Sequence, residues 1–252
     1  ILMALSRLIL VHHQDEETGR LLLRYCGSKN CLISLMKTAI NKEISTTPSS
    51  EVLFREESVA TKLMSALFFS QWGGSEYLHQ VVRPTLQSIA KSLFSTDEVN
   101  LEDELHVIAV RQICEDLLNR IYDSSHFFPV NIRVLLSHTQ KEAAQKFPEM
   151  RSVVVGSFLF LRFIVPALVT PERYHLKTDL NIISSKAVRA VSKIVQTIAN
   201  GGSARSQPEP LQGLVESHQK RLHEYFDKLA NISEVQFTSS DFQFVVEPAT
   251  TY

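Results

Sequence analysis

One apolar stretch dominates this sequence: Val153-Val154-Val155-Gly156-Ser157-Phe158-Leu159-Phe160-Leu161-Arg162-Phe163-Ile164-Val165-Pro166-Ala167-Leu168-Val169. Its length approaches that of a membrane span, but Gly156 and Pro166 interrupt it, and an arginine at mid-depth in lipid is costly. We therefore predict a helix buried inside an all-α domain, apolar all round because neighbouring helices cover every face. Pro166 is predicted to end or kink this helix.

The single charge in that stretch, Arg162, needs hydrogen-bond acceptors. A guanidinium has five N–H donors and keeps its charge at any ordinary pH. Because a buried charge is tolerated only when it is paired or hydrogen-bonded, Arg162 is predicted to face carbonyl or carboxylate oxygens of a neighbouring segment. Two interpretations follow: the arginine braces a purely structural loop, or it braces a functional one.

Composition is that of an ordinary soluble globular protein, with 44% hydrophobic and 21% charged residues among 252. The formal net charge of -1 indicates no general attraction to nucleic acid or to an anionic membrane. Cys26, Cys31 and Cys114 lack metal-ligand spacing, and this sparse, odd number is typical of a reducing compartment. Because the sequence begins inside an apolar pattern at Ile1, we expect a domain cut from a longer protein.

Helical periodicity recurs along the chain, and only 8 Gly and 9 Pro argue against a fold of many strands and turns. We predict a single elongated all-α domain with a central helical bundle. An exposed loop is expected at Ser45–Ser50, a possible kink at Pro84, and an extended tail after residue 233. Helices are predicted near residues 2–9, 21–23, 32–40, 59–67, 77–94, 105–121, 132–147, 153–169, 181–200 and 211–230.

A loop anchored by apolar residues precedes the predicted helix at 59–67. Leu53 and Phe54 can bury themselves in the core, which would leave Arg55 projecting outward. Glu56 and Glu57 are expected in the first turn of the helix, where acidic side chains complement the helix dipole. From these residues alone, Arg55 is either a solvated arginine paired with one of those glutamates or an arginine presented to a partner.

The predicted helix at 181–200 has two contrasting faces. Its buried stripe is Ala187, Val188, Val191, Ile194, Val195 and Ile198. Steps of three and four residues place a second set of side chains on the opposite face: Lys186, Arg189, Lys193, Gln196 and Asn200. Such a stripe is usually a solvated surface, but without acidic residues among its members it also suits an acidic patch on a partner protein.

Three segments together resemble the Ras GTPase-activating (RasGAP) domain family. They are Leu53-Phe54-Arg55 with Ala60-Thr61-Lys62, then Phe158 to Ala167, then Ser192 to Asn200. The resemblance covers roughly residues 2–230, and it implies a RasGAP domain over 1–252 with a core at about 2–230 and a tail at 231–252. No phosphate-binding loop, HExxH motif or catalytic triad accompanies these segments, so we predict an activator in trans without a catalytic cycle of its own.

The resemblance also implies a role for each matching residue. Arg55 corresponds to the arginine finger that enters a GTPase active site, and Arg162 to the arginine that supports the finger loop. The predicted partner-binding residues are Lys193, Gln196, Asn200, Arg189, Leu53 and Phe54. The implied partner is a Ras-family small GTPase in its GTP-bound state, bound by a monomeric domain without nucleic acid or membrane insertion. The chain itself is predicted to need no cofactor, because GTP and Mg²⁺ belong to the partner.

Two alternative functions remain at this point. The chain could be a catalytically silent GAP-like domain, or a helical scaffold that binds a small GTPase or another acidic partner. Ras, R-Ras and Rap all fit as substrates of the main prediction. We expect a cytoplasmic protein, recruited to the inner membrane surface through other parts of the full-length chain.

Overall fold

The computed structural model describes residues 16–69, 74–92, 99–176 and 185–232, and within them it is helical without strands, as predicted. Short 3-10 turns and one π-helical turn, Phe160–Ile164, join or interrupt the α-helices. The α-helices are α2 Glu16–Ser28, α3 Leu32–Thr46, α4 Val59–Phe69, α5 Gly74–Val81, α6 Arg83–Lys91, α7 Glu104–Asp123, α8 Val130–Lys146, α9 Arg151–Leu159, α10 Val165–Val169, α11 Ser185–Ala199 and α12 Glu209–Ala230. The expected helix at 2–9 and the expected tail lie outside these residues.

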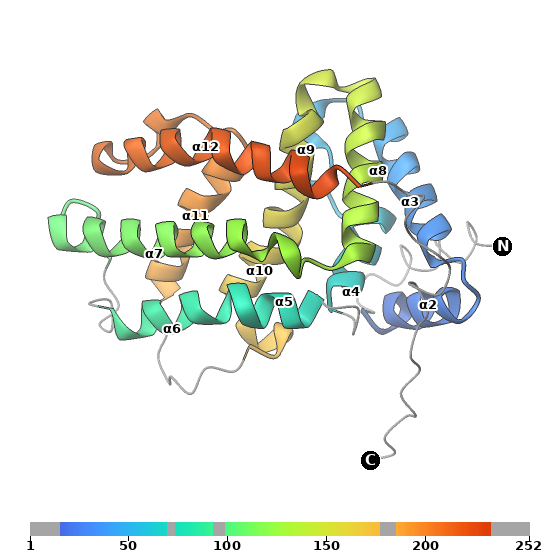
Figure 1. The fold of residues 1–252 in the computed structure, drawn as a ribbon, viewed down its shortest axis with the longest axis horizontal. Helices are drawn as coiled ribbons and strands as arrows, with labels where there is room; N and C mark the ends of the chain where they lie inside the picture. Colours follow the sequence, from blue (N-terminus) through green and yellow to red (C-terminus); the bar gives the residue numbers. More distant parts are fainter. Residues whose placement is uncertain (1–15, 70–73, 93–98, 177–184, 233–252) are drawn as a thin grey trace, which may run out of the picture.

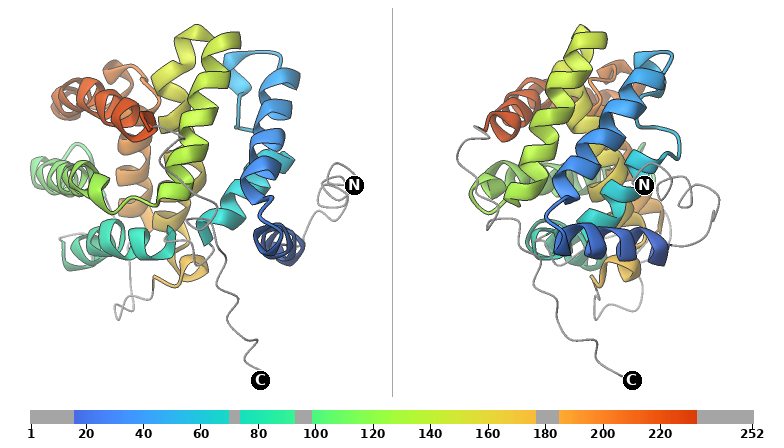
Figure 2. Two further views of the ribbon diagram at one scale, coloured as in Figure 1. Left: turned by 45° about the vertical axis from the view of Figure 1, so that its right-hand side comes forward. Right: turned by 90° about the vertical axis from the view of Figure 1, so that its right-hand side faces the viewer.

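The helices form a bundle with a smaller group at one end. Figure 1 shows α12, α7 and the pair α5–α6 in successive rows, with α11 and α9–α10 crossing behind them, and the same helices pack against one another. At the other end α3 packs against α8 and α4, and α2 against α4 (Figure 2). The helix is interrupted at Val82, between α5 and α6, and Pro84 occupies the first turn of α6, where a proline is tolerated.

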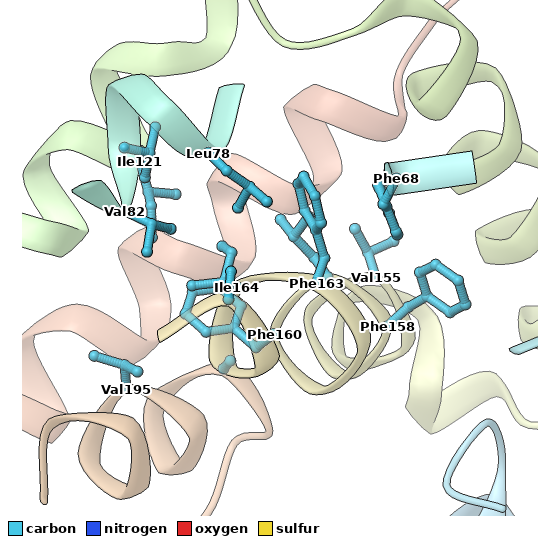
Figure 3. Packing of buried hydrophobic residues seen from close by; sticks show 14 of the residues in the cluster. Phe68, Leu78, Val82, Ile121, Val155, Phe158, Phe160, Phe163, Ile164 and Val195 are labelled. Atoms are coloured by element: carbon cyan, nitrogen blue, oxygen red, sulfur yellow. The ribbon is translucent and has the colours of Figure 1, made fainter. Parts of the chain in front are cut away.

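The apolar stretch at 153–169 lies at the centre, as predicted. Figure 3 shows Phe158, Phe160 and Phe163 leaving this helix in different directions. Phe163 stacks on Phe68 of α4 with ring centroids 4.0 Å apart, and Phe158 contacts the same ring. By length and composition Pro148–Val169 could cross a membrane, yet 61% of its apolar window is buried inside the protein, as in the core helix of a helical domain.

Two expectations for this helix need correction. Pro166 does not end it, because the helical path continues to Val169 with Pro166 in the first turn of α10. The π-helical turn Phe160–Ile164 comes just before α10 and closes with a bond from the Val165 N–H to the Phe160 carbonyl. Nor do neighbours cover every face, since Leu161 and Arg162 are only half-buried and Val169 is 49% exposed. π-helical turns often mark functional sites. Here the π-helical turn carries Arg162.

The start of α4 also differs from the prediction. The helix begins at Val59, so Glu56 and Glu57 precede it instead of occupying its first turn. Ser58 and Thr61 decide this start by reciprocal bonds: the Thr61 N–H donates to Ser58 Oγ at 3.2 Å, and the Ser58 N–H donates to Thr61 Oγ1 at 2.8 Å. This is a capping box built with a threonine, and it fixes the point where the preceding loop ends.

Two further predictions differ from the structure in detail. The helix predicted near 105–121 is present as α7, although of its residues at every fourth position from Leu105 to Ile121 only the later ones are buried and Leu105 is 63% exposed. Four residues span slightly more than one helical turn, so such a row drifts around the helix until its first residues face solvent. The loop expected at Ser45–Ser50 starts later, because α3 continues to Thr46 and Thr47 is buried.

Gly156 sets how closely α9 approaches α11 and α12. A Cβ there would lie 2.3 Å from Phe226 Cε2 and 2.6 Å from the Ala199 carbonyl oxygen. Gly156→Ala is therefore expected to destabilise the domain by about 1–3 kcal/mol, which thermal unfolding would record as a loss of roughly 2–12 °C. Gly213→Ala, in the open interior of α12 with no atom within 4 Å, is the matched control and should be neutral or stabilising. Equal melting temperatures for the two variants would contradict this packing account.

Candidate functional site

The segment from Thr47 to Ser58, here called the Arg55 loop, connects α3 to α4. Its anchors are Leu53 and Phe54, which are 1% and 0% exposed, and the Phe54 ring packs edge-on against Phe158 of α9 at 5.5 Å. The predicted anchoring of the loop is thus confirmed. Phe54 also has a φ of 58°, a left-handed conformation that a bulky residue adopts only when its surroundings hold it there.

Arg162 supplies that restraint from the π-helical turn. Its Nε donates to the Phe54 carbonyl at 3.0 Å, and its Nη2 donates to the carbonyls of Phe54, Arg55 and Glu56 at 2.8, 2.7 and 2.8 Å. The sequence prediction that this arginine faces carbonyls of another segment is confirmed. Burial lowers the pKa of Arg162 and the carboxylates of Glu57 and Glu43 oppose that shift, but a guanidinium stays charged throughout.

Arg55 itself points away from the core. Its side chain is exposed, while its backbone N–H donates to the Val52 carbonyl at 3.1 Å and its carbonyl accepts from Arg162. Glu57 pairs with Lys62 at 3.6 Å, and within the described residues no ion pair involves Arg55. The alternative of an arginine neutralised by a neighbouring glutamate therefore has no support in the described part of the chain.

The polar face of α11 lies opposite this loop. All six residues of its predicted apolar stripe are buried, so Lys193 is exposed and Gln196 and Asn200 are half-buried on the other side. These residues and the Arg55 loop border one open groove of about 520 Å³. Its lining is Arg55, Leu161, Arg162, Lys193, Gln196, Thr197, Asn200, Gly202 and Ser206.

Five of the predicted site residues thus meet in one place although the sequence separates them widely. Arg189 is exposed on the same helix but does not line the groove. Leu53 and Phe54 are not available as contact surfaces because the core covers their side chains. This corrects their assignment to the partner-binding set: their place in the structure is beneath the Arg55 loop, as its support.

Sequence reasoning missed the other lining residues. Leu161 and Thr197 adjoin predicted site residues in the sequence and also line the groove. Gly202 and Ser206 belong to the connection between α11 and α12, where no site was predicted from the sequence. The Asn200 side chain is held by α9, since Ser157 Oγ donates to its Oδ1 at 2.9 Å.

Among the described residues that line the groove, three are cationic and none is a carboxylate. Arg55, Arg162 and Lys193 contribute positive charge, and Gln196 and Asn200 contribute neutral hydrogen-bonding groups. An exposed guanidinium at the rim, with a second one fixing its backbone, can neutralise negative charge presented from outside. The arrangement suits an anionic group carried by another macromolecule.

The chain is similar in sequence to known GTPase activators. Residues 90–200 match the family described as GTPase-activator protein for Ras-like GTPase. Inhibitory regulator protein IRA2 of Saccharomyces cerevisiae is 28% identical over 179 residues, covering 69% of this chain and 6% of that protein. Ras GTPase-activating protein 1 of Homo sapiens is 26% identical over 218 residues, which cover 81% of this chain and 21% of that protein. GTPase-activating protein of Drosophila melanogaster is 27% identical over 246 residues, which cover 92% of this chain and 21% of that protein. The chain therefore spans less than a quarter of the length of these relatives.

Proposed function

We propose that this chain is a RasGAP domain that accelerates GTP hydrolysis by a Ras-family GTPase, because its residues 90–200 match the family of GTPase-activator proteins for Ras-like GTPases. One observation carries the proposal: an exposed arginine, braced through its own carbonyl by a second arginine, borders a cationic groove. In this assignment Arg55 is the arginine finger and Arg162 its support. Lys193, Gln196 and Asn200 receive the partner, and Arg189 lies beside them at the edge of the interface.

The proposed mechanism follows from charge. As the γ-phosphoryl group is transferred to water, negative charge develops on its oxygens and on the leaving bridge oxygen. A guanidinium brought in by the activator neutralises that charge and excludes water from the site. An arginine supplied in trans to Ras contributes roughly 10³–10⁵ in rate, a value established for this class of activator and adopted from it. GTP and Mg²⁺ enter with the partner, so the chain needs only to position its arginine.

A silent GAP-like domain and a general helical scaffold remain the competing functions. The exposed, backbone-braced Arg55 favours acceleration over silent binding, because a domain that only binds needs no such brace. The test is single-turnover hydrolysis by purified Ras, R-Ras and Rap, each loaded with GTP and mixed with excess chain. Acceleration of at least one GTPase supports the proposal. Tight binding to the GTP-loaded GTPase without faster hydrolysis identifies a catalytically silent GAP-like domain. Binding that is equally tight to the GTP-loaded and GDP-loaded GTPase identifies a helical scaffold.

The charge of Lys193 gives a prediction about affinity. Lys193→Glu should weaken association with the GTP-loaded partner by roughly tenfold, mainly through slower encounter, and the wild-type affinity should fall as salt is added. Stopped-flow association measurements at several ionic strengths check both effects. Lys220→Glu is the control, because Lys220 is an exposed lysine of α12 that pairs with Glu224 at 3.8 Å and is not among the residues that line the groove. If the two variants bind equally well, the interface lies elsewhere.

A further inference from the structure

A second cation reaches the Arg55 loop at its other end. Lys146, the last residue of α8, extends to the end of α3, where its Nζ donates to three backbone carbonyls. The distances are 2.9 Å to Ile44, 2.9 Å to Ser45 and 2.7 Å to Thr47. Three acceptors use all three donors of an ammonium group, so this side chain is fully engaged by one short segment.

The backbone carbonyls at the C-terminal end of α3 need a hydrogen-bond donor from outside the helix. The last carbonyls of a helix lack partners within the helix, and cations there are favourable because of the helix dipole. The last turn of α3 contains no basic residue of its own, and its chain leaves the helix at Thr47 in an extended conformation. Lys146 therefore supplies from α8 the positive charge that the last turn of α3 lacks, at the residue where the Arg55 loop begins.

Lys146 and Arg162 bind the Arg55 loop at two points, one where the loop begins and one at its tip. Lys146 binds the carbonyl of Thr47 at the entry, and Arg162 binds the carbonyls of Phe54 to Glu56 at the tip. Between these two points the backbone turns tightly, because the Leu53 N–H donates a hydrogen bond to the Ser50 carbonyl at 3.4 Å. Lys146 ends α8, Arg162 lies in the π-helical turn that continues α9, and α8 packs against α9, so both cations reach the loop from the same pair of packed helices.

From this geometry we infer that Lys146 is a positioning residue for Arg55, holding the entry of the loop so that Arg162 can fix its tip. The inference rests on the proposed function, in which Arg55 acts on the GTP bound to a partner GTPase. Lys146 does not line the groove and touches no reacting atom. Its effect on hydrolysis therefore passes entirely through the placement of Arg55.

The experiment compares three variants of the whole chain. Lys146→Met keeps the aliphatic stem but removes the donors, and Lys146→Arg keeps a charged donor group. Lys141→Met is the control, because Lys141 is an exposed lysine of the same helix outside the Arg55 loop. Each variant is assayed for single-turnover hydrolysis by Ras loaded with GTP over a range of chain concentrations. Amide hydrogen exchange across residues 47–58 and thermal unfolding are measured on each chain alone.

Lys146→Met is expected to lower the maximal rate about tenfold, since a misplacement of about 1 Å can cost roughly 100-fold. The half-saturating concentration should change less than about twofold, because Lys193 and the rest of the groove are untouched. Exchange in residues 47–58 should become faster, while the melting temperature stays close to that of Lys141→Met. Lys146→Arg should restore most of the rate and of the protection.

Two results would overturn the inference. In the first, Lys146→Met matches Lys141→Met in both maximal rate and loop exchange. In the second, it lowers the melting temperature and weakens binding but keeps the maximal rate, as a purely structural residue would. Failure of the wild-type chain to accelerate hydrolysis is a different result, which contradicts the proposed function on Ras. The exchange comparison would still decide whether Lys146 holds the loop.

Discussion

Replacing Arg55 with alanine is expected to reduce the acceleration of GTP hydrolysis by roughly 10³-fold or more, the range established for an arginine finger acting on Ras. The physical reason is that Arg55 is an exposed guanidinium at the rim of the groove, while its backbone is held from behind by Arg162. Alanine removes the charge without disturbing that backbone. Binding to the GTP-loaded partner should therefore change little, and single-turnover hydrolysis alongside equilibrium binding measures the two effects separately.

Arg55→Lys tests whether charge alone is sufficient. A lysine keeps the positive charge but loses the planar fork that contacts two oxygens at once, so it should recover only a small part of the rate. Arg24→Ala, at an exposed arginine of α2 outside the groove, is the matched control and should behave like wild type. The finger assignment would be falsified if Arg55→Ala accelerated hydrolysis as well as Arg24→Ala does.

Arg162→Ala is expected to act on both stability and rate. It leaves three carbonyls without their donor and opens a gap beside the π-helical turn, at a cost of about 1–3 kcal/mol in the free energy of unfolding. It also releases Phe54 from its restraint, and a left-handed conformation at such a residue relaxes once it is no longer enforced. The acceleration should consequently fall although Arg55 is present, and thermal melts together with single-turnover assays record both losses.

A double-mutant cycle between Arg55 and Arg162 separates shared from independent action. If Arg162 works by presenting Arg55, the double variant should be scarcely slower than Arg55→Ala alone. Arg162→Lys should rescue little, because the guanidinium reaches the carbonyls through two nitrogens at fixed angles. Rate losses that simply add would show that Arg162 acts independently of Arg55. A destabilised but fully active Arg162→Ala would make it only a packing residue.

Much of the site could be predicted from the sequence because its parts follow local rules. The two faces of α11 follow from apolar residues spaced at three and four, and every residue of the predicted stripe is buried. The outward placement of Arg55 follows from the two apolar residues before it. The need of Arg162 for carbonyl acceptors follows from the chemistry of a guanidinium in an apolar helix, and the acceptors are present.

Where the predictions were wrong, an interaction beyond the local pattern was responsible. Ser58 and Thr61 cap α4 and move its start past Glu56 and Glu57. The central helix continues past Pro166 to Val169, and its π-helical turn carries Arg162 on a half-buried face. Burial of Leu53 and Phe54 takes them out of reach of a partner, although their position next to Arg55 in sequence placed them in the interface.

The sequence by itself determined the helical class, the apolar central helix and the chemical identity of the residues at the site, because periodicity and side-chain chemistry act over a few residues. Only the tertiary structure decided that Arg55, Arg162 and Lys193 border one groove, and that Lys146 reaches the carbonyls of α3. Each of those contacts joins segments far apart in the chain. Their formation depends on how whole helices pack, and the spacing of residues along one helix contains no information about it.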